Sequence, residues 1–332
     1  MHVDERYVAI DQIKGLSILG VIYIHCYPLI KGAGLIGEVT LALSRLAVPI
    51  FLFFYCFFLE KSVSRRGSTV YKDRLYAISS CYLVWTIVYF LVNADFSLLY
   101  LEPHKLLTGY WWGYGWSGQY FFLILIQLTV IFPALRRLSR WKHSEIILAL
   151  VTGAIYIYLS YYGVGGVIYK LGSMPVVYWL SYSVLGIQLA GTNTPPIDSA
   201  TKYSMIRVII CFISVVLIPV ELITYGLNAH FPYMFVSLLF AVHLLLPMLY
   251  NKFTVSKCNL KNLSLFGKNS LALFVMNPML VHFSALLLHG PVTVNSAVIG
   301  YVMLISITFV LAWLIIVVLP FLRRTNLRYV LQ

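Results

Sequence analysis

The sequence has 332 residues, of which 61% are hydrophobic and only 11% are charged. Soluble domains average about 45–50% apolar and about 25% charged residues, so this composition excludes an ordinary soluble globule and indicates an integral membrane protein. The formal net charge of +13 does not indicate nucleic-acid binding, because the basic residues are spread between apolar segments instead of forming one patch.

Ten apolar segments approach or exceed the length of about 20 residues that a membrane-spanning helix requires. In chain order they cover residues 8–30, 35–59, 74–93, 117–135, 145–163, 173–190, 204–225, 231–250, 268–288 and 296–321. No gap between them is long enough for a large soluble domain. The sequence therefore predicts an all-α polytopic membrane protein of about ten transmembrane helices, with residues 1–332 forming a single transmembrane domain.

The basic residues between these segments predict the orientation. With the N-terminus in the cytoplasm, the cytoplasmic segments carry nineteen Lys and Arg residues and the outer segments carry three, at Lys31, Lys105 and Lys170. Lys and Arg favour cytoplasmic loops, so both termini are predicted to be cytoplasmic. The longest outer connection, 94–116, is rich in Trp and Tyr, which suit either interfacial anchoring or stacking on a sugar.

Cysteine usage gives no sign of a disulfide framework or a metal site. The number is odd, four of the five lie in apolar segments, and none has metal-ligand spacing. We interpret them as small buried hydrophobic residues and expect no bound metal. The first apolar segment is too long and too charged for a cleaved signal peptide, so it is predicted to be retained as a helix.

Three ionisable residues lie in this first segment, which reads IDQIKGLSILGVIYIHCYPL from residue 10. Asp11 and Lys14 are three residues apart and can pair on one helix face. His25 follows Lys14 by eleven residues, about three full turns and about 16 Å, so it lies on nearly the same face. This polar stripe should face the protein interior or one shared watery cavity. The alternatives are a headgroup position for the pair and a hydrogen-bonded core position for the histidine.

This segment resembles the first helix of the acyltransferase-3 family of bacterial membrane acyltransferases. The usual family pattern is a basic residue, commonly arginine, then ten residues and a histidine, and here it reads Lys14 and His25. Lysine keeps the positive charge of arginine but loses its planar, two-pronged geometry.

Further stretches resemble the family in order and spacing over nearly the whole chain: SRLAVPIFLFFYCFFLEK, YKDRLYAISSCYLVW, GQYFFLILIQLTVIFPAL, SYSVLGIQLAG and GKNSLALFVMNPMLVHF. Two of them depart from the family pattern. Tyr55 and Cys56 replace a Ser-Gly pair, and in the last stretch Phe274 and Asn277 replace the usual Tyr and His.

The resemblance implies an O-acyltransferase that moves an acyl group, usually acetyl, from cytoplasmic acetyl-CoA to a hydroxyl of a carbohydrate. The implied acceptor is a cell-surface polysaccharide or its lipid-linked precursor, as for O-antigen, common antigen or capsule. The implied location is the bacterial inner membrane, with the lipid bilayer as a partner and no permanently bound cofactor. The chain ends soon after the tenth predicted helix, so we expect no appended hydrolase-like domain.

Charge, position in the segments and the resemblance together suggest roles for residues of this chain. His25 is the expected general base on the acceptor hydroxyl, since a sugar hydroxyl is a poor nucleophile at neutral pH. Asp11 is expected to hold Lys14, and the expected donor-site residues are Lys14, Lys72 and Arg74. The expected substrate-binding residues are Arg45, Tyr120 and Asn277.

Several alternatives remain open at this point. Arg45 lies about ten residues into the second segment, where it lines a cavity or extends toward the outer interface. A covalent acyl carrier would be Cys26 or His25, although direct transfer is favoured. His282 is a second candidate for the missing family histidine. The competing function is a transporter of a lipid-linked glycan or an anionic solute, in which the same polar residues line a conduction path.

Overall fold

The computed structural model of the chain describes residues 3–93, 109–110, 113–141, 143–161, 166–191, 204–225, 231, 233–255 and 260–323. The helices of ten or more residues are α1 (Val3–Cys26), α2 (Gly34–Ser44), α3 (Ala47–Arg66), α4 (Thr69–Asn93), α7 (Gln119–Leu138), α8 (Ser144–Tyr161), α10 (Leu180–Gly191), α11 (Ser204–Tyr225), α12 (Val236–Val255), α14 (Ser270–Leu287) and α15 (Ala297–Arg323). The short elements are η1 (Tyr27–Leu29), β1 (Ile30–Lys31), α9 (Gly166–Leu171), η2 (Val176–Trp179), α13 (Lys261–Lys268) and β2 (Val292–Thr293). Most of the Trp- and Tyr-rich connection 94–116 lies outside the described residues.

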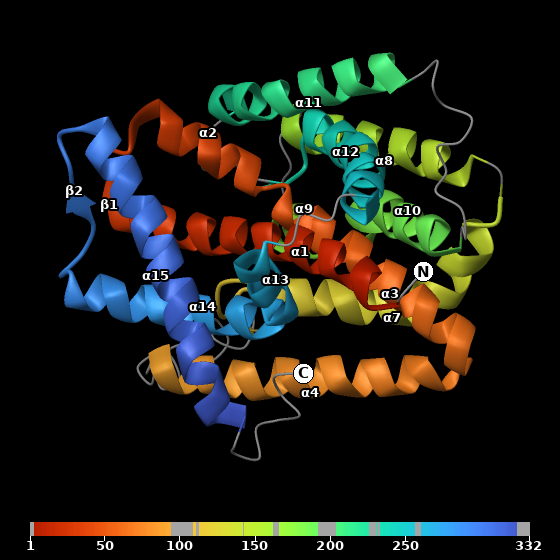
Figure 1. Cartoon of the computed structure of the whole chain (residues 1–332), viewed down its shortest axis with the longest axis horizontal. Helices are drawn as coiled ribbons and strands as arrows, with labels where there is room; N and C mark the ends of the chain where they lie inside the picture. Colours follow the sequence, from red (N-terminus) through yellow and green to blue (C-terminus); the bar gives the residue numbers. More distant parts are fainter. Residues whose placement is uncertain are drawn as a thin grey trace.

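Within the described part of the chain, seven helical segments are long and apolar enough to cross a membrane, and three shorter apolar helices accompany them. The seven segments and the three helices correspond to the ten segments predicted from the sequence. The prediction of an all-α polytopic membrane protein is therefore confirmed, while the number of crossings and the side of each terminus stay predictions. In Figure 1, α1, α4, α7 and α11 run lengthwise, with α11 and α4 at opposite edges of the bundle.

The second predicted helix, 35–59, is broken in the structure. α2 ends at Ser44 and α3 begins at Ala47, and the turn between them holds Arg45. The Arg45 amide bonds to the Ala42 carbonyl, three residues back, as in a tightened 3₁₀ turn. Pro49 has no amide hydrogen for the Arg45 carbonyl four residues earlier, which explains the interruption here.

Glycines allow two helix pairs to meet backbone to backbone. A β-carbon on Gly267 of α13 would overlap the Asp11 carbonyl oxygen of α1, and one on Gly15 would overlap the Leu263 carbonyl oxygen. In the same way, a β-carbon on Gly186 of α10 would overlap the Phe53 carbonyl oxygen of α3. Small residues that permit such close approach are typical of helix packing in membranes. The approach at Gly267 fixes the end of α1 that carries Lys14.

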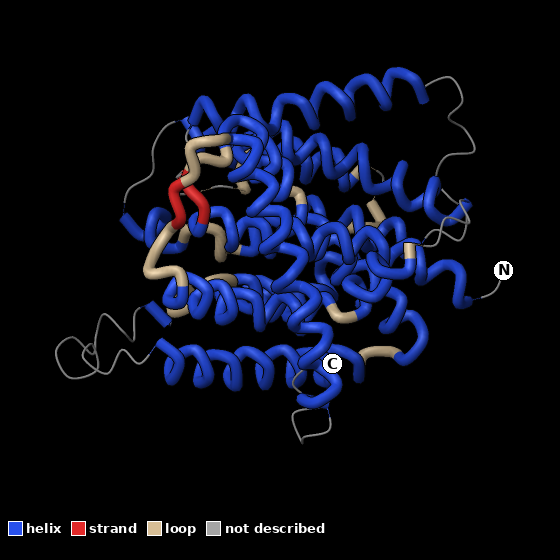
Figure 2. The backbone as a smooth tube through the Cα atoms, turned by 60° about the vertical axis from the view of Figure 1, so that its left-hand side comes forward, coloured by secondary structure: helices blue, strands red, loops and turns tan. Residues whose placement is uncertain are grey.

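A two-residue parallel pairing ties together segments that are far apart in the sequence. Ile30 of β1 pairs with Val292 of β2, next to the ends of α1 and α14. Figure 2 shows these strands beside each other at one end of the bundle. Only Cys26 and η1 lie between His25 and β1, so the pairing anchors the chain just after His25.

Candidate active site

One cavity, of about 480 Å³, lies between α1, α3, α4, α7 and α14. Three cationic side chains line it, Lys14, Arg65 and Arg74, so we call it the basic cavity. Most of the remaining wall is aromatic or aliphatic. The cavity therefore suits a ligand with an anionic part and an apolar chain.

Lys14 is held in this wall by two contacts. Its ammonium lies 3.8 Å from the Asp11 carboxylate, as the three-residue spacing predicts, and 5.9 Å from the centre of the Phe58 ring. Asp11 itself is not among the lining residues of the basic cavity. Asp11 is thus placed to orient Lys14 from behind, while the ammonium reaches the cavity.

A second cavity, of about 450 Å³, contains the predicted general base. We call it the histidine cavity. His25 of α1, Arg45 from the break between α2 and α3, and Tyr120 of α7 all line it, and Tyr233 joins them from the turn before α12. The expectation that His25 faces a cavity is confirmed by this lining.

His25 has a hydroxyl partner from a distant part of the chain. Its Nδ1 lies 3.0 Å from Ser117 Oγ in the turn before α7. That turn depends on Gly118, whose φ of 93° lies in the left-handed region that favours glycine. Since Nδ1 is hydrogen-bonded to Ser117, Nε2 is the ring nitrogen left to exchange a proton with another group.

Arg45 contributes the cation of the histidine cavity. Its guanidinium carbon lies 5.1 Å from the centre of the Tyr233 ring, a cation–π contact. Its Nε is buried and has no hydrogen-bond partner among the described residues. A buried guanidinium nitrogen without a partner is costly, and Arg45 lines the cavity, where an anionic or carbonyl oxygen of a ligand would offset this cost.

Tyr114 closes one wall of the histidine cavity outside the membrane-spanning helices. Its hydroxyl donates to the Leu171 carbonyl at 2.8 Å and accepts from the Ser173 amide at 2.9 Å. Burial raises the pKa of Tyr114 above its ordinary value, so the hydroxyl stays protonated at neutral pH. The two bonds fasten the turn that carries Ser117 to the last residue of α9 and to the segment after it.

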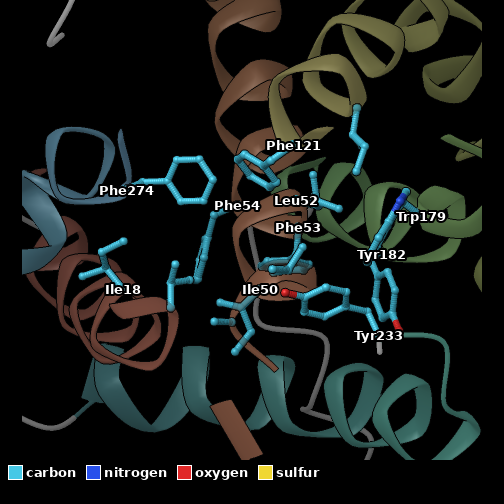
Figure 3. Packing of buried hydrophobic residues seen from close by; sticks show 14 of the residues in the cluster. Ile18, Ile50, Leu52, Phe53, Phe54, Phe121, Trp179, Tyr182, Tyr233 and Phe274 are labelled. Atoms are coloured by element: carbon cyan, nitrogen blue, oxygen red, sulfur yellow. The ribbon is translucent and has the colours of Figure 1, made fainter. Parts of the chain in front are cut away.

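The two cavities meet at Phe274 of α14, which lines both of them. Its ring centre lies 5.0 Å from that of Phe121. Figure 3 shows Phe274 pointing toward Phe121, with Phe54 beside them. The polar stripe of α1 therefore faces two cavities that share an aromatic wall, where the sequence suggested one continuous hollow.

A family model described as an acyltransferase domain, that of the acyltransferase-3 family, matches residues 7–317. The chain belongs to this family. All the residues that line the two cavities lie within the matched range. The protein is accordingly a multi-pass membrane acyltransferase. Comparisons with curated proteins and with solved structures gave no match.

Not all predicted site residues of the acyltransferase come together. Arg74 lines the basic cavity, but Lys72 is exposed and does not line either cavity. Cys26 is fully buried in the core and His282 is exposed on α14, and neither lines a cavity. The placement of Cys26 favours direct acyl transfer over a cysteine-bound intermediate.

Asn277 also lies outside both cavity walls, and the structure gives it a local task. Pro278 cannot donate to the Phe274 carbonyl, four residues earlier. The Asn277 side-chain nitrogen supplies that donor at 2.8 Å, and it also reaches the Leu273 carbonyl at 2.9 Å. The Tyr89 hydroxyl bridges the next pair of backbone groups in α14, because it donates to Val275 O and accepts from Met279 N. Asn277 thus stabilises α14 where proline interrupts it.

Replacing Asn277 with aspartate is expected to lower stability and leave substrate binding unchanged. An ionised carboxylate has no donor, and a protonated one has a single donor in place of the two of the amide, so a carbonyl of this fully buried turn loses a partner, at a cost of about 1–3 kcal/mol. Thermal unfolding of the detergent-solubilised protein measures this, with Ser284→Ala on the same helix as the control. An unchanged melting temperature together with a raised acceptor KM would instead give Asn277 a substrate-binding role.

Sequence reasoning missed Ser117, Tyr233 and Arg65 as site residues. Ser117 and Tyr233 lie in turns, and nothing in their local sequence marks them as partners of His25 and Arg45. Arg65 resembles the other loop cations that the positive-inside rule explains. The structure places it in the last turn of α3, beyond the end of the predicted segment 35–59, so no signal in the sequence separated it from those cations.

Proposed function

We propose that this acyltransferase moves an acetyl group from cytoplasmic acetyl-CoA to a hydroxyl of a cell-surface polysaccharide or its lipid-linked precursor, in the bacterial inner membrane. The observation that carries the proposal is the pairing of two cavities across one aromatic wall. One has the cations that an anionic thioester needs, and the other has an imidazole beside a buried cation.

The donor occupies the basic cavity in this proposal. Coenzyme A carries phosphate groups, which Arg65 and Arg74 can bind with charge-assisted hydrogen bonds at the cavity mouth. Lys14 lies deeper along the same wall, held by Asp11. The apolar lining accommodates the thioester arm, and its carbonyl end points to the wall at Phe274.

The acceptor hydroxyl enters the histidine cavity. Nδ1 lies 3.0 Å from Ser117, and in the tautomer that this mechanism uses it carries the proton, so that His25 Nε2 removes the hydroxyl proton as the oxygen attacks the acyl carbon. A carbon–oxygen bond forms, the carbon–sulfur bond breaks, and the thiolate that leaves takes up a proton to give coenzyme A. The Arg45 guanidinium stabilises the negative charge that develops on the acyl oxygen.

The donor assignment is tested by a matched pair of neighbouring cations. Arg74→Gln removes a cation of the basic cavity and is expected to raise the KM for acetyl-CoA by about 10- to 100-fold, the loss of one charge-assisted contact. Lys72→Gln removes a neighbouring cation that does not line that cavity and is expected to leave KM within about twofold, because a charge that does not touch the bound donor is screened by salt. Initial rates of radiolabelled acetyl transfer in membrane vesicles give both values, and equal KM values for the two variants would exclude this donor site.

The acceptor class is tested in cells. Mass spectrometry of surface glycans from a strain without the gene is expected to show polymer in normal amount but without its acetyl groups. Complementation with the wild-type gene restores the acetyl groups. Loss of the polymer itself would instead indicate a transporter.

A further inference from the structure

Phe274 stands at the junction of the two cavities and is fixed from two directions. Its ring centre lies 5.0 Å from that of Phe121 and 6.0 Å from that of Phe122, both on α7. A β-carbon on Gly118 would lie 3.0 Å from the Phe274 Cζ atom, so the backbone of that turn packs close against the ring tip. The ring is 8% exposed and is confined between α7 and the turn that carries Ser117.

The backbone of Phe274 is held as firmly as its ring. Asn277 donates to its carbonyl, and the Tyr89 hydroxyl bridges Val275 and Met279 in the next turn of α14. The Tyr89 ring in turn stacks on Trp116, with ring centres 4.6 Å apart. These contacts make the wall a built feature of the fold and not a loosely placed side chain.

We propose that the Phe274 ring limits the length of the acyl group that this enzyme transfers. The inference rests on the proposed donor and acceptor cavities. The acceptor oxygen has to meet the acyl carbon beside the Phe274 ring, where the two cavities adjoin, and an acyl chain of two carbons needs little room there. Each further methylene has to occupy the space that the ring fills, and a well-packed interior resists such added volume.

The first test compares acyl chain lengths. Membranes are offered acetyl-CoA and butyryl-CoA in competition, and Phe274→Ala is expected to raise the butyryl-to-acetyl ratio of the product by about tenfold or more. Phe283→Ala is the matched control, because Phe283 is an exposed phenylalanine of the same helix that lines neither cavity, and its ratio is expected to stay at the wild-type value. If Phe274→Ala does not fold, Phe274→Leu is expected to give a smaller rise in the same direction. An unchanged ratio in an active variant at position 274 would overturn the proposal.

A second measurement does not depend on acyl transfer. Val48 lines the histidine cavity only, so Val48→Cys reports access to it. Methanethiosulfonate ethylammonium is applied to the face onto which the basic cavity opens, and modification at position 48 is followed by peptide mass spectrometry. Adding Phe274→Ala is expected to speed modification by about tenfold or more, since the ring then no longer separates the cavities.

The two measurements separate the possible failures. A wild-type protein that transfers no acyl group from either thioester would contradict the proposed function, and the labelling rates would still decide whether Phe274 separates the cavities. Equal labelling rates with and without Phe274→Ala would overturn the proposal whatever the enzyme's donor is.

Discussion

Replacing His25 with glutamine is expected to lower acyl transfer by about 100- to 10,000-fold, the usual contribution of general acid–base catalysis. The amide of glutamine can keep a hydrogen bond to Ser117, which lies 3.0 Å from the imidazole Nδ1. It cannot accept a proton at neutral pH, so the acceptor hydroxyl would have to attack without losing its proton. The loss should appear in kcat, with the KM for acetyl-CoA nearly unchanged, because His25 does not line the basic cavity.

The measurement is the initial rate of acetyl transfer in membranes containing equal amounts of folded protein. His282→Gln is the matched control, since His282 is an exposed histidine outside both cavities, and its rate is expected to stay within about twofold of the wild-type rate. Size-exclusion chromatography in detergent confirms that each variant is folded. A His25→Gln variant with more than about a tenth of the wild-type kcat would rule out a general base at this position.

The features that the sequence predicted well are those that depend on one segment at a time. Hydropathy located the apolar helices, because each needs its own run of apolar residues to face lipid. Helical spacing also gave the pairing of Asp11 with Lys14 and the cavity-facing position of His25. These relations hold within a single helix and require no knowledge of what packs against it.

The features that the sequence did not predict depend on contacts between distant segments. Ser117 is 92 residues from His25, and only the bundle brings the two together. The aromatic wall likewise requires α7 and α14 to meet, so the sequence suggested one hollow where the fold makes two. The role of Asn277 could not be predicted for a different reason. In the sequence, a polar residue before a proline looks the same whether it binds substrate or donates a hydrogen bond to its own helix.

The position of Lys14 depends on a contact that a single methyl group should break. Gly267→Ala is expected to destabilise the protein by about 3 kcal/mol or more, the upper end of the range for overpacking. Its β-carbon would overlap the Asp11 carbonyl oxygen, and a backbone atom cannot rotate away as a side chain can. The melting temperature in detergent should fall, and the surviving folded protein should show a raised KM for acetyl-CoA, because α1 shifts together with Lys14.

Gly20→Ala is the control within α1, because its β-carbon would make only ordinary contacts of 3.5 Å with Ser44. It is expected to leave the melting temperature nearly unchanged and to gain slightly from the higher helix propensity of alanine. If Gly267→Ala were as stable as Gly20→Ala, α13 would have to move away from α1 without cost. The basic cavity would then not depend on this packing, and the role of Asp11 in holding Lys14 would have to be explained without α13.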